Sequence, residues 1–253
     1  MDLGIAGRTA LVTGSYRGTG AAIAASLAAE GVDVLVHGFE PGQPDAVVAD
    51  INASAAPGRA TGVVGDLLTD EGVDRLMAAV GTDLDIVVCN YGLAEGGRWA
   101  TASDDDWFDS YNRNVMSAVR VARAAMPLLT GQGWGRIVLL GTVGSVRPAA
   151  QRPQYYAAKG ALPAITVSLA KELADTGVTV NLVSPGIIAT AEVMERLRGR
   201  PMEEVFGMST LTGRPAETGE VADLVTYVCS NQAASITGTN LRIDSGTAEA
   251  VSP

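Results

Sequence analysis

Short apolar runs alternate with longer helical patterns along the whole chain. Most of the short runs are rich in β-branched residues and are bounded by Gly, Asp or Pro. This pattern is typical of strands that are buried on both faces of a parallel sheet. We therefore predict strands at residues 9–14, 32–38, 61–65, 84–89, 135–141, 178–184 and 240–244.

Helical patterns fill the intervals between these strands, for example at residues 21–31, 106–129 and 155–173. Regular alternation of strand and helix predicts right-handed βαβ units, and hence an α/β fold with a doubly wound parallel sheet and helices on both faces. Neither a linker nor a repeat interrupts the pattern, so we expect residues 1–253 to form a single domain. Ligands of such sheets bind beyond the carboxyl ends of the strands, and we expect the functional residues there.

The composition narrows the class of partner. The chain has 28 Asp and Glu against 18 Lys and Arg, a formal net charge of −10. This balance argues against nucleic acid or an anionic membrane surface as the main partner. Two cysteines and one histidine predict neither a disulfide scaffold nor a metal site. Without an apolar run of membrane-spanning length or a signal-like N-terminus, we expect a soluble cytoplasmic protein.

The first predicted strand leads into a glycine-rich turn, TGSYRGTG, at residues 13–20. Glycine permits a tight turn and close backbone approach, and the following helix offers N–H groups and its positive dipole end to a phosphate. Gly14, Gly18 and Gly20 follow the spacing G-x-x-x-G-x-G and not the best-known dinucleotide fingerprint. A turn without a ligand therefore stays open as the alternative. Arg17 is either a phosphate ligand or a solvated surface arginine.

Tyr155 and Lys159 form the candidate proton-transfer pair, because a spacing of four residues places both on one face of a helix. A tyrosine pKa of about 10 is too high for efficient acid/base catalysis near neutral pH, and a neighbouring cation lowers it. Tyr156 points about 100° away around the helix and does not share that face. The pair predicts proton transfer to or from a carbonyl or alcohol oxygen.

An ordered set of short motifs runs through residues 7–246: TGSYRGTG (13–20), GDL (65–67), CNYG (89–92), NVM (114–116), YYAAK (155–159), NLVSPGIIAT (181–190) and DSG (244–246). The set resembles the short-chain dehydrogenase/reductase family, and within it the 3-oxoacyl-carrier-protein-reductase-like oxidoreductases. The resemblance implies a Rossmann-type sheet, NAD(H) or NADP(H) as cofactor, and a small carbonyl or secondary alcohol as substrate. It also implies a homo-oligomer, either a tetramer or a dimer.

The resemblance assigns roles to individual residues. The family tetrad of Asn, Ser, Tyr and Lys falls on Asn114, Thr142, Tyr155 and Lys159, so a threonine takes the serine position. Thr142 keeps the hydroxyl donor and adds a methyl group, and Ser145 is a second-ranked donor. The implied cofactor contacts are Gly14, Ser15, Arg17, Gly18, Thr19, Gly20, Asp66, Leu67, Asn90, Gly92, Tyr155, Lys159, Pro185, Gly186, Ile188 and Thr190.

The end of the second strand decides between the two nicotinamide cofactors. NAD-dependent enzymes place a carboxylate there on the ribose hydroxyls, but the matching position is Gly38, followed by Phe39 and Glu40. Arg17 can pair with a 2′-phosphate, so we expect NADP(H), with NAD(H) as the alternative if Glu40 reaches the ribose. We interpret His37 as a wall of the adenosine site or a satisfied surface residue and not as a catalyst.

Several departures from the family pattern leave questions open. Tyr91 replaces a small residue beside the ribose and either narrows the site or tilts outward, and Pro163 is expected to kink the helix that carries Tyr155. Residues 190–213 are expected to cover the substrate as a mobile lid, with an amphipathic surface helix as the alternative. The second functional hypothesis is a dinucleotide-binding protein that senses or scaffolds without turnover. The sequence does not identify the substrate.

Overall fold

The strands form one parallel sheet in the computed structural model, which describes residues 2–248. The sheet order is β3-β2-β1-β4-β5-β6-β7, and every neighbouring pair is parallel. The predicted seven-stranded, doubly wound sheet is thereby confirmed. The strand bounds are β1 (Thr9–Val12), β2 (Asp33–Gly38), β3 (Ala60–Val64), β4 (Ile86–Cys89), β5 (Gly135–Leu140), β6 (Val178–Pro185) and β7 (Asn240–Ile243).

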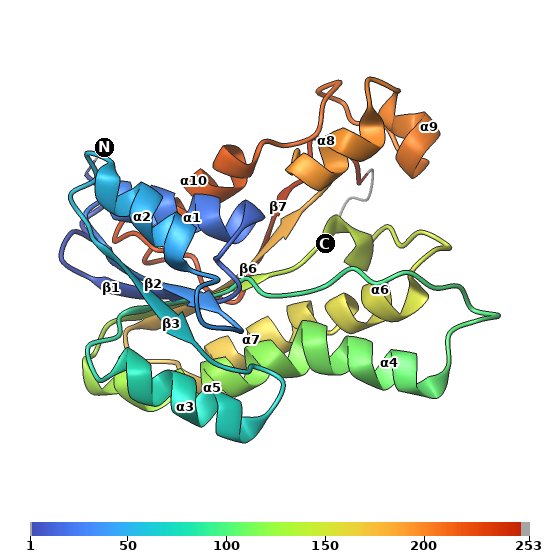
Figure 1. Ribbon diagram of the computed structural model, residues 1–253. Coiled ribbons are helices and arrows are strands. Elements are labelled where there is room, and N and C mark those ends of the chain that lie inside the picture. Colours follow the sequence, from blue (N-terminus) through green and yellow to red (C-terminus); the bar gives the residue numbers. More distant parts are fainter. Residues whose placement is uncertain (1, 249–253) are drawn as a thin grey trace.

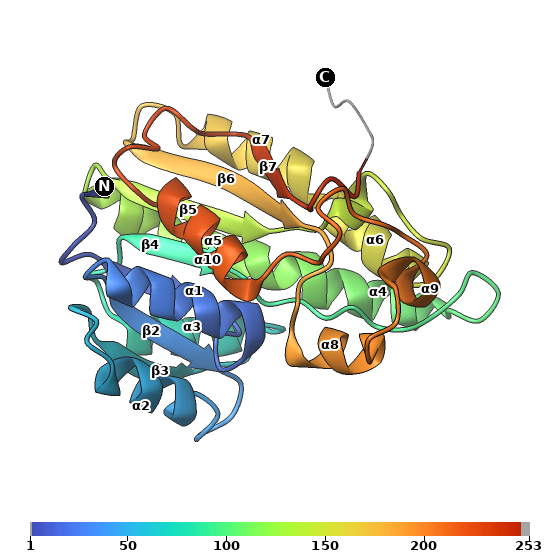
Figure 2. The same ribbon diagram turned by 90° about the horizontal axis from the view of Figure 1, so that it is seen from above.

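Helices cover both faces of the sheet (Figure 1). One face packs against α1 (Gly18–Ala29), α2 (Asp45–Ala53) and α10 (Thr218–Val228), and the other against α3 (Asp70–Val80), α5 (Ser117–Gly131) and α7 (Leu162–Glu172). Figure 2 shows α1 and α10 side by side over the sheet. Each face has its own apolar core, because the central strands are buried on both sides and present alternate residues to the two layers.

The two long predicted helices are each interrupted. The first consists of α4 (Asp104–Tyr111), a π-helical turn η1 (Asn112–Met116) and α5. The second divides at Ala161 into α6 (Pro153–Gly160) and α7, because Pro163 has no N–H to continue the hydrogen-bond ladder. Where a kink was expected at Pro163, the helix divides two residues earlier, and Pro163 lies in the first turn of α7.

The strand order reverses direction at β1, which pairs with both β2 and β4. In open α/β sheets this switch point leaves a crevice beyond the carboxyl ends of the strands. Two short helices, α8 (Ala191–Leu197) and α9 (Met202–Phe206), rise above this end of the sheet (Figures 1 and 2). Among the described helices, none is both long and apolar enough to cross a membrane.

Candidate active site

Two adjoining chambers lie at the carboxyl ends of the strands. Chamber A has a volume of about 670 Å³ and lies next to the glycine-rich turn, and chamber B has about 730 Å³ and lies under α8 and α9. The chambers share the residues Ala94, Arg152, Tyr155, Ile188, Thr190, Val193 and Arg196. Chamber A brings together these residues of the predicted cofactor set: Gly14, Arg17, Gly18, Thr19, Gly20, Asn90, Gly92, Tyr155, Lys159, Pro185, Ile188 and Thr190.

His37 holds the glycine-rich turn in place. The Gly14 N–H donates to His37 Nδ1 at 3.0 Å, so the ring carries its proton on Nε2, which donates to the Gly65 carbonyl at 2.9 Å. The side chain is fully buried, and burial lowers the pKa of His37, which favours this neutral tautomer. His37 therefore has a structural role at the ends of three strands and is not a surface residue.

The first turn of α1 is open to an anion. The helix begins without a capping side chain, whereas Thr69, Ser103 and Thr190 cap α3, α4 and α8. Uncapped N–H groups and the helix dipole favour a phosphate. A Cβ on Gly20 would lie only 2.5 Å from Asn90 Nδ2, so glycine is required where the turn meets the loop after β4.

Three predicted cofactor residues do not line either chamber. Ser15 is fully buried, its hydroxyl donates to the Val12 carbonyl at 2.6 Å and accepts from the His37 N–H at 2.9 Å, and its own N–H donates to the His37 carbonyl. Ser15 thus supports the turn and has no N–H or O–H left for a ligand. Asp66 accepts from the Leu68 N–H at 2.8 Å, and the side chain of Leu67 is buried in the core.

Lys159 is nearly fully buried, and its ammonium donates to the Leu140 carbonyl at 2.8 Å. Burial lowers the pKa of Lys159 to about 8. A Cβ on Gly92 would lie 2.9 Å from both Lys159 Nζ and Asn114 Oδ1, so both polar groups lie against this glycine. A glycine is thus needed to bring the loop after β4 against α6 (Pro153–Gly160).

Asn114 ties this loop to the π-helical turn. Its Oδ1 accepts from the Leu93 N–H at 2.8 Å, and its Nδ2 donates to the carbonyls of Leu93 and Ser110 at 3.0 Å each. The side chain is 1% exposed and lines neither chamber. A π-turn widens the helix at Asn114, as is common at functional sites.

Tyr155 stands where the two chambers meet. Burial raises the pKa of Tyr155 to about 12, against the lowering effects of a hydrogen bond with Thr142 and of the charge on Arg152. Desolvation outweighs these two contacts in this geometry, and the lowering of this pKa by Lys159 stays a prediction.

Thr142 begins the short helical turn η2 (Val143–Ser145) and lines chamber B, as does the predicted residue Gly186. The Thr142 Oγ1 accepts from the Gly144 N–H at 3.1 Å, which fixes the hydroxyl beside Tyr155. Ser145 donates its own hydroxyl to the Thr142 carbonyl at 2.8 Å. Ser145 is thus engaged in the turn and is not a substitute donor.

Tyr91 lines chamber A and also packs against Phe39, with a distance of 4.7 Å between ring centroids. Phe39 in turn lies edge-on to His37 at 5.2 Å. The backbone N–H groups of Phe39 and Glu40 donate to Gln43 Oε1 at 2.7 and 3.3 Å. The end of β2 therefore presents an aromatic ring and an amide, with the Glu40 side chain exposed.

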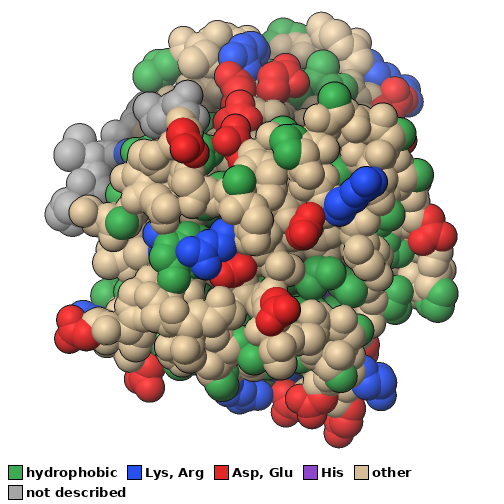
Figure 3. Space-filling view, turned by 90° about the vertical axis from the view of Figure 1, so that its left-hand side faces the viewer, with side chains coloured by type: hydrophobic (Ala, Val, Ile, Leu, Met, Phe, Trp, Pro, Cys, Tyr) green, Lys and Arg blue, Asp and Glu red, His purple; other side chains and the backbone are tan. Residues whose placement is uncertain are grey.

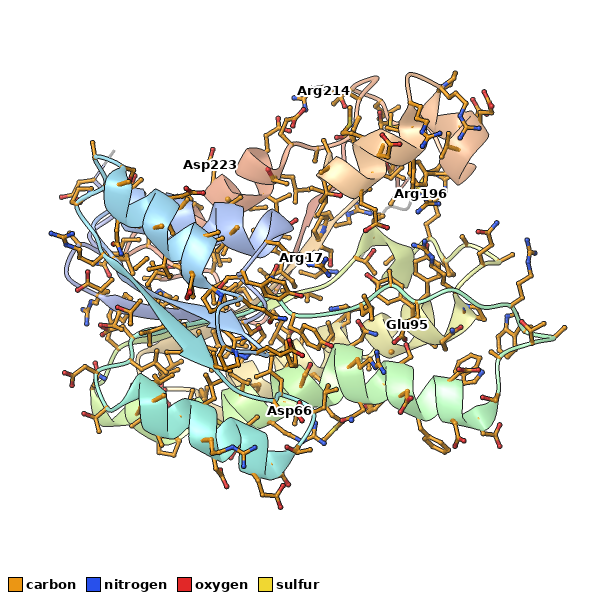
Figure 4. The ribbon with its side chains drawn as sticks, in the orientation of Figure 1. Arg17, Asp66, Glu95, Arg196, Arg214 and Asp223 are labelled. Atoms are coloured by element: carbon orange, nitrogen blue, oxygen red, sulfur yellow. The ribbon has the colours of Figure 1, made fainter. Side chains whose placement is uncertain are left out.

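Sequence reasoning missed two arginines of this site. Arg152 and Arg196 line both chambers. Arg152 immediately precedes α6, the helix that carries Tyr155. Arg196 belongs to α8, and Figure 4 shows its side chain extending from that helix toward the layer below it.

Comparison with known proteins agrees with this geometry. The model of the enoyl-(acyl carrier protein) reductase family matches residues 14–248. The 3-oxoacyl-[acyl-carrier-protein] reductase FabG of Pseudomonas aeruginosa is 32% identical over an alignment of 248 residues that covers 96% of this chain and 98% of the relative.

Two solved structures are also similar. L-sorbose reductase from Gluconobacter frateurii, complexed with NADPH and L-sorbose, has a TM-score of 0.92 and 28% identity, covering 99% of this chain and all of that one. A 3-oxoacyl (acyl-carrier-protein) reductase from Agrobacterium tumefaciens with NADP bound has a TM-score of 0.87 and 29% identity, covering 97% and 96% of the two chains.

Fold, site and relatives together define the class. The chain belongs to the short-chain dehydrogenase/reductase family, as its motifs indicated, and is an oxidoreductase of that family with a Rossmann-type sheet.

Proposed function

We propose that this protein interconverts a ketone and a secondary alcohol with NADP(H) as its cofactor. The observation that carries the proposal is the position of Tyr155 at the junction of two chambers, with Lys159 on the side of chamber A and Thr142 on the side of chamber B. The nicotinamide, when bound in chamber A, supplies or accepts the hydride. The protein has to supply the proton and the electrostatic support for the reacting oxygen.

Each polar residue then has one task. The Tyr155 hydroxyl gives its proton to the carbonyl oxygen during reduction and takes it back during oxidation. The Thr142 hydroxyl donates a hydrogen bond to the same oxygen as negative charge develops there. The buried ammonium of Lys159 stabilises the tyrosinate that reduction leaves behind. Asn114 holds the loop after β4 against Lys159.

NADP(H) is favoured over NAD(H) by the charges around the site. Arg17 lines chamber A and, within residues 2–248, takes part in no ion pair. The strand end that would carry an NAD-selecting carboxylate carries Gly38 and Phe39. The two solved relatives described above were obtained with NADPH and NADP.

The test is fluorescence titration of the protein with NADPH and with NADH. We expect tighter binding of NADPH and, for Arg17→Ala, a loss of about 30-fold for NADPH with little change for NADH, because a charge-assisted bidentate contact is removed. Arg75→Ala, an exposed arginine on α3, is the matched control. Equal or tighter binding of NADH would contradict the cofactor assignment. Tight binding without turnover of any carbonyl would favour a sensing role.

We further propose that the protein forms a homo-oligomer through α5 and α7. An apolar groove of about 440 Å³ between these helices is lined by residues that include Val119, Met126 and Leu169. Burying such a groove against a second copy would remove apolar surface from water. Light scattering coupled to size-exclusion chromatography checks the assembly, and a monomer that persists at high concentration would contradict it.

A further inference from the structure

Chamber B is cationic although the protein as a whole is acidic. Its charged lining residues are Arg98, Arg152, Arg196 and Glu204, in a chain of net charge −10. Glu204 is already paired with Arg200 at 3.4 Å. Among the described residues, the three arginines of the chamber form no ion pair.

Arg152 is held at the reacting end of this chamber by its backbone. Its φ of 63° and ψ of 44° lie in the left-handed region, which is uncommon for a residue with a side chain. The Arg152 N–H donates to the Gly97 carbonyl at 2.9 Å, and Pro153 follows in the chain. Such conformations persist where the surroundings impose them, and they concentrate at functional sites. Arg152 is half-buried at the start of α6, one turn before Tyr155, and its charge acts on Tyr155.

Arg196 reaches the chambers from the opposite side. Its guanidinium lies 4.9 Å from the centroid of the Phe206 ring, so α8 and α9 hold it through a cation–π contact. Arg196 lines chambers A and B together with Arg152. Glu192 on the same helix lines chamber A alone, away from the substrate side.

We propose that the substrate is a short oxo acid or hydroxy acid whose carboxylate binds Arg152, with Arg196 closing over it from α8. The inference rests on the proposed function and names the substrate class of that site. A guanidinium fork matches a carboxylate in two parallel hydrogen bonds. Arg152 and Tyr155 line both chambers, and the charge on Arg152 acts on Tyr155, so the bound anionic group lies only a few bonds from the reacting carbon. A substrate whose phosphate lies at the far end of a long carrier arm does not place its anionic group this close to the reacting carbon.

The carboxylate takes no part in the bond changes. In reduction, hydride from the cofactor forms the new C–H bond, and the proton of Tyr155 forms the O–H bond. The carbonyl π bond breaks, the cofactor is oxidised, and the carboxylate stays ionised on Arg152. A matching methyl ester undergoes the same bond changes without the anionic contact.

The experiment compares oxo acids with their methyl esters. The carboxyl carbon is placed one, two or three bonds from the carbonyl carbon, and kcat/KM with NADPH is measured for wild type, Arg152→Gln, Arg152→Lys and the control Arg75→Gln. In wild type we expect a higher kcat/KM for the best acid than for its ester. In Arg152→Gln the acid-to-ester ratio falls by about 100-fold, since a charged bidentate contact is lost, and Arg152→Lys restores part of it. Arg196→Gln lowers the ratio by a smaller factor.

A second measurement decides the inference independently of turnover. Binding of each acid and ester to the protein with NADP⁺ is followed by calorimetry. Tighter binding of an acid that is lost in Arg152→Gln supports the proposal even if the chosen acids turn over slowly. An ester that is used and bound as well as its acid, with no change of ratio in Arg152→Gln, overturns the carboxylate site and leaves the proposed function standing. Absence of turnover for all carbonyl compounds, with this binding intact, overturns the proposed function instead.

Discussion

The amino and carboxyl ends of the strands differ in whether their charged residues are paired. At the amino ends of the strands, the Trp134 ring lies between the guanidinium groups of Arg8, 4.0 Å from the ring centroid, and Arg136, 4.2 Å from it. Arg8 pairs with Asp85 at 2.7 Å, and Arg136 donates to the carbonyls of Gly135 and Ser230. Figure 3 shows acidic, basic and hydrophobic side chains interspersed on this face.

At the carboxyl ends, Arg17, Arg152 and Arg196 line the chambers without an ion pair in the described part of the chain. Polar groups that satisfy one another stabilise the folded state, whereas groups left open toward a chamber are available to a ligand. The comparison teaches that stability and function are separated along the strand direction. Substitutions at the amino ends of the strands should therefore change stability, and substitutions at the carboxyl ends should change binding or turnover.

The largest effect is expected for Tyr155→Phe. This change removes the hydroxyl that we propose as the proton donor and keeps the ring that packs against Tyr156, 5.3 Å away between centroids. We expect kcat to fall by about 10³-fold, the usual contribution of a positioned acid/base. NADPH affinity and the melting temperature should stay near wild type. A variant that retains most of its activity would show that another group transfers the proton.

Trp134→Ala should produce the opposite result. The change removes two cation–π contacts and the hydrogen bond from Trp134 Nε1 to Asn231 Oδ1 at 3.0 Å. We expect a loss of about 2–3 kcal/mol in the free energy of unfolding, measured in urea, with kcat unchanged at low temperature. A fall in kcat without loss of stability would show that stability and function are not separated along the strand direction.

A smaller effect is expected in the pH dependence of stability. Burial lowers the pKa of Lys159 from 10.5 to about 8, so between these values the unfolded chain binds the proton and the folded chain releases it. The cost of burying the charge is fully present below pH 8 and disappears as the pH rises toward 10.5. From pH 8 to 10 this adds about 2 kcal/mol to the free energy of unfolding.

Lys159→Met provides the control for this slope, because it keeps an unbranched side chain and removes the titration. The free energy of unfolding of the wild type should rise relative to that of the variant by about 2 kcal/mol over the same interval. Above pH 10 the raised pKa of Tyr155 acts in the other direction, since the unfolded tyrosine ionises first. A constant difference across the interval would mean that Lys159 is protonated in both states.

The site was predictable where local spacing fixes geometry. Four residues of helix bring Tyr155 and Lys159 to one face, and the glycine-rich turn after β1 lies at the chamber as expected. The pKa values were not predictable, because they depend on how deeply each group is buried and on which carbonyl it meets. Ser15 and His37 illustrate the same limit: both lie at the turn, but their side chains point into the protein.

The sequence by itself determined the strand and helix order and the positions of the glycine-rich turn and of the helix that carries Tyr155, since periodicity and short-range spacing act within one element. Only the tertiary structure decided that Arg152, held in a left-handed backbone, and Arg196, carried by α8, line the same chambers. Residues far apart in sequence meet through the packing of whole layers, and their electrostatic environment comes from burial. No local pattern encodes either of these.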